Sequence, residues 1–174
     1  MVTLSSLTPE EFLAYEEQHD DTLFNFADGE VIAVEATIQR GHSAVEFMAA
    51  FRDYLRTNPI GTGYGRVLHV FGNQLYQPDV CVHSDKGDAA GYFTTPPLVA
   101  VEIRTEPLTK PIQRRKALAY LANGTPMVIA VFPGEGLEVY RPDHEPVVLS
   151  YGDVLDGDDV LPGFNVKVDG LLGD

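Results

Sequence analysis

The chain has 174 residues, of which 44% are hydrophobic and 10% aromatic, a content typical of globular proteins and too high for a disordered one. No apolar run approaches the about 20 residues that span a bilayer, and the N-terminal segment lacks the basic and apolar regions of a secretory signal. Its single cysteine, Cys81, excludes an intrachain disulfide and is typical of a reducing compartment. We therefore expect one domain over residues 1–174, located in the cytoplasm and without a membrane partner.

Charge is distributed unevenly along the chain. The net charge is −14, with −9 in residues 1–35, −8 in residues 135–174 and +3 in residues 36–134. The acidic balance argues against a protein that coats nucleic acid nonspecifically, because phosphate binding needs clustered Lys and Arg. Five of the twelve Lys and Arg lie between Arg104 and Lys116. This basic segment predicts either a solvated helix face or a local positive cleft.

The first part of the chain predicts a helix, a hairpin and a second helix. Residues 8–18 open with the Thr-Pro-Glu-Glu sequence of a capping box, which favours a short helix. Residues 22–36 read as two short strands that turn at 28–29, an Asp-Gly dipeptide. Apolar residues at helical spacing over residues 41–58 predict the second helix.

The remainder predicts mainly strands around one further helix. The expected elements are two strands over 64–84 turning at 72–73, a loop over 87–97, a buried strand over 98–105, a helix in the segment 110–124, a buried strand over 126–132, two strands over 136–152 and one short strand in the tail. The helix has Pro111 near its start and Gly124 just past its end. The strand–helix–strand order at 98–132 implies a right-handed crossover and a parallel strand pair. We therefore predict an α/β fold with a central mixed β-sheet flanked by helices.

Two carboxylates stand where apolar residues are expected. Asp79 opens the apolar run Val-Cys-Val, and Glu102 interrupts a strand of the kind that is buried on both faces. Burial of an unpaired charge is costly, so each carboxylate needs a partner or a function. On a helical wheel, Lys116 shares a stripe with Ile112 and Tyr120. Since a crossover helix lies against the sheet it leaves, we expect Lys116 near Glu102.

Glu30, after the turn at 28–29, is a further candidate. Two or three carboxylates with a lysine form a hard-oxygen site suited to Mg²⁺. Such a metal would stabilise charge on a phosphate and lower the pKa of an attacking water. The structural alternatives are a turn-capping Asp79, a buried Glu102–Lys116 ion pair and a merely exposed Glu30.

Other motifs carry less information. His42, at the start of the second helix, either faces the cleft or is exposed on the surface. The other histidines lack zinc-like spacing, and one cysteine cannot build a thiolate site. The segment GTGYGR places Arg66 where a nucleotide-binding loop has its third glycine, and a strand is expected after it, so we expect no nucleotide cofactor.

The ordered segments FADGEVIAV, GHSAVEFMAAFRDYL, YQPDVCV, PPLVAVEIRTEPL, RRKALAYLANGTPMVIAVF and GLEVYRP resemble the bacterial family known as "putative restriction endonucleases" of the Uma type. This family lies within the PD-(D/E)XK nuclease superfamily, and the resemblance implies a restriction-endonuclease-like core. It matches Asp79 to the Asp of a Pro-Asp pair and Glu102 to the Glu of the next core strand. Lys116 matches a lysine that has moved to the following helix, and Glu30 matches a Glu after an Asp-Gly turn.

The function that this resemblance implies is Mg²⁺- or Mn²⁺-dependent endonucleolytic hydrolysis of DNA phosphodiester bonds. Asp79, Glu102 and the carbonyl of Ile103 would bind the metal, with Glu30 assisting, and Lys116 would position the attacking water. The phosphate contacts would come from Arg104, Arg114 and Arg115. Because many nucleases of the superfamily cut duplex DNA with one site for each strand, we expect a homodimer.

The chain departs from the family pattern at two positions near these residues. Arg104 stands where the superfamily's basic pattern has a lysine, and Ile112 stands where family members often have Asp. Arginine can bind phosphate but is a poor proton acceptor. The alternative function is therefore a catalytically inactive nuclease-fold domain that binds a protein or a nucleic acid. A nuclease acting on RNA is a third possibility.

Overall fold

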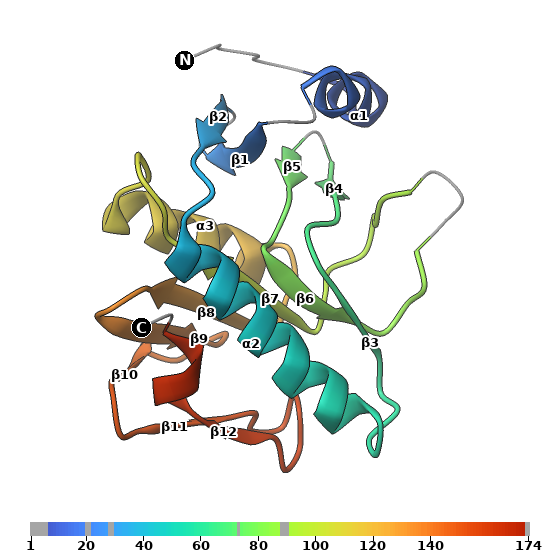
Figure 1. The fold of residues 1–174 in the computed structure, drawn as a ribbon. Helices are drawn as coiled ribbons and strands as arrows, with labels where there is room; N and C mark the ends of the chain where they lie inside the picture. The colour runs from blue at the N-terminus through green and yellow to red at the C-terminus, as the bar shows by residue number, and fades with distance from the viewer. Residues whose placement is uncertain (1–6, 20–21, 28–29, 73, 88–90, 173–174) are drawn as a thin grey trace.

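The fold is α/β, with a central sheet between helices (Figure 1). The computed structural model describes residues 7–19, 22–27, 30–72, 74–87 and 91–172. The elements are α1 (Pro9–Gln18), β1 (Leu23–Ala27), β2 (Glu30–Val34), α2 (Ile38–Leu55), β3 (Thr62–Tyr64), β4 (His69–Phe71), β5 (Gln74–Tyr76), β6 (Val80–His83), β7 (Val99–Ile103), α3 (Lys110–Ala122), β8 (Met127–Phe132), β9 (Gly136–Tyr140), β10 (Val147–Leu149), β11 (Val154–Asp156), β12 (Asn165–Lys167) and the 3₁₀ helix η1 (Val168–Leu171). No helix within these described residues is both long enough and apolar enough to cross a membrane.

The central sheet has six strands in the order β10-β9-β8-β7-β6-β3. β7 and β8 run parallel, with Val99 opposite Met127, and α3 connects them as predicted. The other neighbouring pairs of this sheet are antiparallel. The predicted mixed sheet flanked by helices is therefore confirmed.

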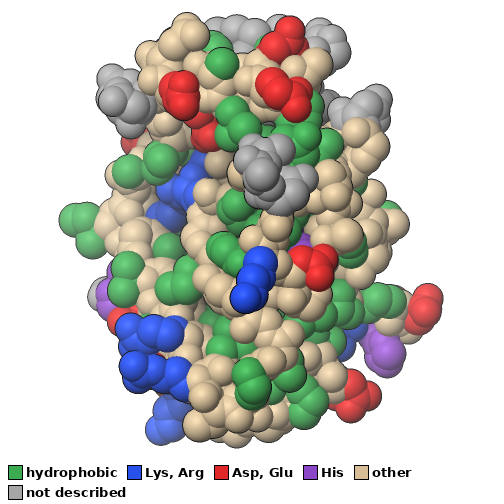
Figure 2. Space-filling model, turned by 90° about the vertical axis from the view of Figure 1, so that its right-hand side faces the viewer, with side chains coloured by type: hydrophobic (Ala, Val, Ile, Leu, Met, Phe, Trp, Pro, Cys, Tyr) green, Lys and Arg blue, Asp and Glu red, His purple; other side chains and the backbone are tan. Residues whose placement is uncertain are grey.

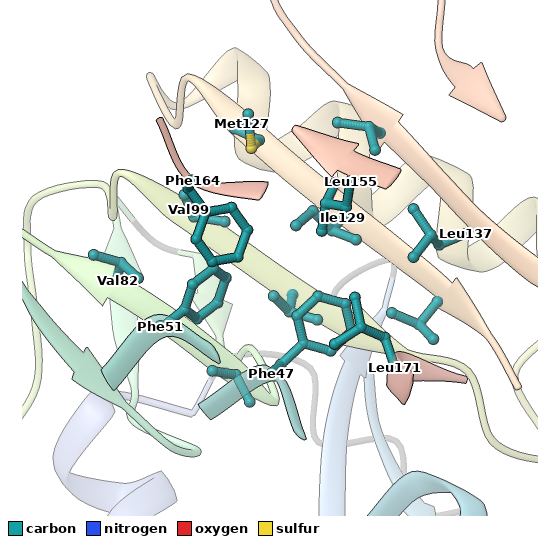
Figure 3. Close-up of a cluster of buried hydrophobic side chains, with 14 of the residues drawn as sticks. Phe47, Phe51, Val82, Val99, Met127, Ile129, Leu137, Leu155, Phe164 and Leu171 are labelled. Atoms are coloured by element: carbon teal, nitrogen blue, oxygen red, sulfur yellow. The ribbon is translucent and has the colours of Figure 1, made fainter. Parts of the chain in front are cut away.

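One face of the sheet packs against α2 and the C-terminal segment (Figure 1). Side chains alternate between the two faces of a strand, so every second residue of β6 to β9 enters this core. Phe47 and Phe51 of α2 lie over these residues, and the ring centroids of Phe51 and Phe164 are 5.3 Å apart (Figure 3). Leu171 of η1 closes the same core. This packing fixes α2 against the sheet and so positions its first turn.

The opposite face of the sheet is covered by α3. Ala117 and Tyr120 of this helix pack against a group that includes Ala100 and Ala130. Small strand residues allow a helix to approach a sheet closely, so the buried stripe of α3 lies directly on β7 and β8. As predicted, the helix has a proline in its first turn and ends before Gly124, whose φ is +97°.

A smaller lobe, uppermost in Figure 1, contains α1, the β1–β2 hairpin and the β4–β5 ribbon. The predicted capping box is present: the Thr8 amide donates to Glu11 Oε2 at 2.8 Å, and the Glu11 amide donates to Thr8 Oγ1 at 3.2 Å. Phe12 of α1 shares an apolar cluster with Phe24 and Leu68. β1 and β2 pair as an antiparallel hairpin, whereas the predicted turn at 28–29 lies outside the described residues.

Two strands that turn at 72–73 were predicted over residues 64–84. β4 and β5 pair on either side of these positions, with Phe71 opposite Gln74, so the hairpin is confirmed. It is shorter than predicted, because β6 is a third strand that joins the central sheet beside β3. Pro78 lacks a backbone N–H and cannot continue a ladder, so β5 and β6 are distinct strands. The bridge between His69 and Phe93 then holds β4 beside the following loop.

Two further boundaries differ from the predictions. α2 begins at Ile38, three residues earlier than predicted, because Thr37 caps it by accepting a hydrogen bond from the Arg40 amide at 3.2 Å. The tail forms two strands, β11 and β12, and a 3₁₀ helix, where one strand was predicted.

His69 and His83 are buried beside Phe93. The ring of His83 stacks on Phe93 with centroids 3.9 Å apart, and the two imidazole centroids are 5.7 Å apart. Burial lowers the pKa of His69 from 6.5 to about 4, against the opposing effect of a hydrogen bond to the Val67 carbonyl. His69 is therefore neutral in the folded protein at pH values where the unfolded chain is protonated. The contribution of this buried neutral imidazole to the free energy of unfolding is complete above about pH 6.5 and is lost as the pH falls toward 4.

Replacing His69 with phenylalanine is expected to weaken the acid sensitivity of the fold. The pKa difference corresponds to about 3 kcal/mol, so the loss of unfolding free energy between about pH 7 and pH 4 should shrink by that amount. Urea denaturation at the two pH values measures the change. His144→Phe, at an exposed position, is the control. An acid sensitivity equal to that of the wild type would contradict the prediction.

Candidate active site

Asp79 and Glu102 are neighbours across the central sheet. β6 and β7 run antiparallel with Val80 opposite Val101, which places the two carboxylates side by side on the face that α3 covers. The Asp79 amide donates to the Val101 carbonyl at 2.9 Å, and the Ile103 amide donates to Asp79 Oδ2 at 2.7 Å. The two residues are only 3% and 0% exposed. Asp79 is therefore a buried group at the end of the sheet, not a surface turn residue.

Glu102 is held by two side chains of α3. Lys116 Nζ donates to Glu102 Oε2 at 2.6 Å, and the Tyr120 hydroxyl donates to Oε1 at 2.9 Å. Lys116 and Tyr120 are one helical turn apart on the buried stripe, as predicted. Burial raises the pKa of Glu102, while the charge of Lys116 acts in the opposite direction. Burial and the neighbouring carboxylate raise the pKa of Tyr120 well above its usual value, so its hydroxyl stays a donor.

Asp79 is held by two arginines that the sequence analysis missed. Arg40, in the first turn of α2, forms an ion pair with Asp79 Oδ1, and Arg66 Nη1 lies 3.5 Å from the same oxygen. The side chains of Arg40 and Arg66 are only 8% and 20% exposed. With the helix start at Ile38, Arg40 falls on the same buried stripe as Phe47. An arginine at a position of the apolar helix stripe is the sequence signal that would have identified Arg40 as a site residue.

Arg66 also connects the smaller lobe to this site. Its Nη2 atom donates to the Phe24 carbonyl and to Gln77 Oε1, the latter at 2.7 Å. Gln77 Nε2 in turn donates to Glu16 of α1 at 3.2 Å. Burial lowers the pKa of Arg66, while the charge of Asp79 acts against this shift. The guanidinium is thus fixed by groups from several segments of the chain.

The predicted phosphate-binding arginines lie farther along the α3 side of the sheet. Arg104 Nη2 donates to Glu135 at 3.1 Å. Arg114 forms two hydrogen bonds to Glu138, from Nε at 3.0 Å and from Nη2 at 2.5 Å. Arg115 is exposed on α3. Arg104 Nη1 also lies 3.5 Å from Glu106 Oε1. The described ion pairs of Arg104 and Arg114 are therefore not with the two buried carboxylates.

The two remaining candidates lie on different elements. Glu30 begins β2, and its side chain is outside the described part of the structure. His42 lies two residues after Arg40 in α2, about 200° around the helix, and is exposed. Its position agrees with the surface alternative.

The oxygen donors of the site fit a hard divalent cation. The carboxylates of Asp79 and Glu102 lie together, and the carbonyl of Ile103 would complete the predicted set; Mg²⁺ prefers such oxygen ligands. Among the residues that the structure describes, no group of three or more His, Cys, Asp and Glu could hold a metal ion. From the described residues, a metal at this position would have two carboxylates as ligands, together with backbone, water or substrate oxygens.

Acidic and basic side chains both reach the surface. On the face shown in Figure 2, acidic side chains lie at the top and at the lower right, whereas Lys or Arg side chains lie in a recess beneath the top, at the centre and at the lower left.

Comparison with known proteins reveals relatives with the same fold. The sequence model of the Uma2 family, described as "Putative restriction endonuclease", matches residues 9–169. No curated protein matches the chain. The crystal structure of a "putative nuclease belonging to DUF820" from Anabaena variabilis superposes with a TM-score of 0.78 at 19% sequence identity, covering 99% of this chain and 98% of that one. At this identity the similarity shows a shared fold.

Proposed function

Because the chain belongs to the Uma2 family, we propose that it is a metal-dependent endonuclease that hydrolyses phosphodiester bonds of DNA. The observation that carries this proposal is the buried cluster in which Asp79 lies beside Glu102 and Lys116 contacts Glu102. These are the predicted carboxylates and lysine: Asp79 directly precedes β6, Glu102 lies in β7 and Lys116 lies in α3. The cluster supplies the donor types that metal-dependent phosphodiester hydrolysis requires.

We propose Mg²⁺ or Mn²⁺ as the cofactor, bound by Asp79, Glu102 and the carbonyl of Ile103, with Glu30 assisting directly or through water. When bound, the metal supplies positive charge to the scissile phosphate and lowers the pKa of the attacking water. The protein fixes the carboxylates in advance: the Ile103 amide holds Asp79, and Tyr120 holds Glu102. Such supporting hydrogen bonds keep ligands in a productive geometry.

Lys116 would orient the attacking water. Its ammonium group donates to Glu102 Oε2 and so lies beside the carboxylates, where the attacking water would accept a hydrogen bond from it. Arg104, Arg114 and Arg115 would contact backbone phosphates of the DNA. For Arg104 and Arg114 this contact requires an exchange of their present acidic partners for phosphate.

We further propose a homodimer in the cytoplasm, with one site for each DNA strand. The basic recess in Figure 2 supports a polyanionic substrate despite the net charge of −14. Local positive potential in a recess can attract a substrate of the same overall sign as the protein.

A second candidate function is a catalytically inactive nuclease-fold domain that binds a protein or a nucleic acid. Two observations favour it. Arg104, at the position of the superfamily's lysine, is paired with Glu135. Asp79 is already paired with Arg40. Both ion pairs are compatible with a protein in which these side chains stabilise the fold and take no part in catalysis.

Incubation with supercoiled plasmid and Mg²⁺ or Mn²⁺ distinguishes the two functions. We expect nicked and linear DNA, none in the presence of a chelator, and a rate at least about 100-fold lower for Glu102→Gln, since metal-ion charge stabilisation is worth several kcal/mol and about 1.4 kcal/mol is tenfold. Calorimetry should show weaker Mn²⁺ binding by the same variant. Glu145→Gln, at an exposed position, is the control.

Single-stranded DNA and RNA in parallel reactions identify the polynucleotide that is cut. Cleavage of RNA alone would replace DNA as the substrate. A folded wild type that cuts none of the three, or cuts equally well after Glu102→Gln, would favour the inactive binding domain.

A further inference from the structure

Arg40 pairs with the carboxylate of Asp79, which the proposed function assigns to the metal. Its guanidinium forms an ion pair with Asp79 Oδ1, and its side chain is 8% exposed. The placement follows from the sequence, because Thr37 caps α2 and puts Arg40 on the buried face of the first turn. The contact is therefore built into the helix start, in contrast to the exposed pair of Arg52 and Asp53 farther along α2.

The charges around Asp79 oppose the binding of a metal alone. The described ion pairs around Asp79 join two carboxylates, Asp79 and Glu102, to three cations, Arg40, Arg66 and Lys116. A divalent cation added here lies beside two guanidinium groups that already contact Asp79 Oδ1, in a buried place where charges are weakly screened. A phosphodiester group brings one negative charge and reduces this repulsion. Metal and phosphate are thus each bound better in the presence of the other.

Arg40 is the cation of this cluster that is suited to exchange partners. Arg66 is held by the Phe24 carbonyl and by Gln77, and Lys116 by Glu102. In the described structure, by contrast, the buried Nε atom of Arg40 has no hydrogen-bond partner. A guanidinium can bind a phosphate through two parallel hydrogen bonds, in the same way as it binds a carboxylate. Rotation of its side chain would release Asp79 Oδ1 without moving the capped helix.

We propose that Arg40 binds a substrate phosphate in exchange for Asp79, so that the divalent cation and the nucleic-acid phosphate bind cooperatively. This inference rests on the proposed function, because it assigns Asp79 to the metal. Arg40 is then a substrate-binding residue that also weakens metal binding in the absence of substrate. One ion pair couples the two binding events.

The test is Mn²⁺ binding by calorimetry, without DNA and with a short phosphorothioate duplex that resists cleavage. Wild-type protein should bind Mn²⁺ weakly alone and more tightly with the duplex. Couplings between sites are typically about 5- to 150-fold. In Arg40→Gln, Mn²⁺ alone should bind at least about tenfold more tightly than in the wild type, and the duplex should add little. Arg52→Gln, on the same helix, should behave as the wild type.

Arg40→Lys provides a second variant in which the positive charge near Asp79 is kept. It should bind Mn²⁺ alone as weakly as the wild type and should lose part of the coupling, because an ammonium lacks the fork. Mn²⁺ binding in Arg40→Gln that is equal to or weaker than in the wild type, in a protein shown to be folded by circular dichroism, would overturn the role of Arg40. An absence of Mn²⁺ binding in every variant, with or without duplex, would instead overturn the metal site of the proposed function.

Discussion

Replacing Asp79 with asparagine is expected to lower the rate of metal-dependent DNA cleavage by at least about 100-fold and to destabilise the fold. The amide oxygen of asparagine can still accept the hydrogen bond of the Ile103 amide, so the backbone geometry is kept. The negative charge is lost, however, both for the metal and for Arg40 and Arg66. Breaking a buried ion pair leaves an uncompensated charge and costs about 3–5 kcal/mol.

The double variant Asp79→Asn/Arg40→Gln separates these two effects. Removal of the unpaired guanidinium should restore much of the unfolding free energy, measured by urea denaturation, whereas plasmid cleavage should stay absent. Arg52→Gln in combination with Asp79→Asn is the matched control, because Arg52 is exposed on the same helix and contacts Asp53 instead. If cleavage returned together with stability, Asp79 would serve the fold and not the reaction.

The parts of the fold that were predicted correctly are those with local signals. β8 is a continuous apolar run, β7 is apolar apart from Glu102, and α3 has a proline in its first turn and a glycine after its end. The contact between Glu102 and Lys116 was predictable for a related reason. A crossover helix must pack on the strands that it connects, so the helical stripe alone identifies which residue faces Glu102.

The arginine contacts to Asp79 could not be predicted in the same way. Arg40 and Arg66 lie 39 and 13 positions from Asp79, and no rule of chain connection brings the start of α2 to the start of β6. The error at the start of α2 removed the remaining signal, because it left Arg40 outside the helix. The separation of β6 from the β4–β5 ribbon was missed because alternation of apolar residues indicates a strand but not the sheet that the strand joins.

Replacing Lys116 with methionine is expected to lower the unfolding free energy by about 3–5 kcal/mol, the cost of leaving a buried charge without its partner. Glu102 is 0% exposed. In this variant it would keep the neutral hydroxyl of Tyr120 as a donor and lose the ammonium as counterion. Lys110→Met is the matched control on the same helix. Lys110 pairs with Glu135 at the surface, where an ion pair contributes about 0–1 kcal/mol.

The second substitution Glu102→Gln, added to Lys116→Met, distinguishes a structural pair from a catalytic one. Without either charge the site contains a neutral amide and a methionine of similar size, so stability should return toward that of the wild type. Buried ion pairs are often replaceable in this manner without loss of stability. If the pair serves only the fold, a double variant that is stable should cut DNA as the wild type does. We expect it to be stable and inactive, because the metal would lose one carboxylate ligand and the attacking water would lose the ammonium that orients it.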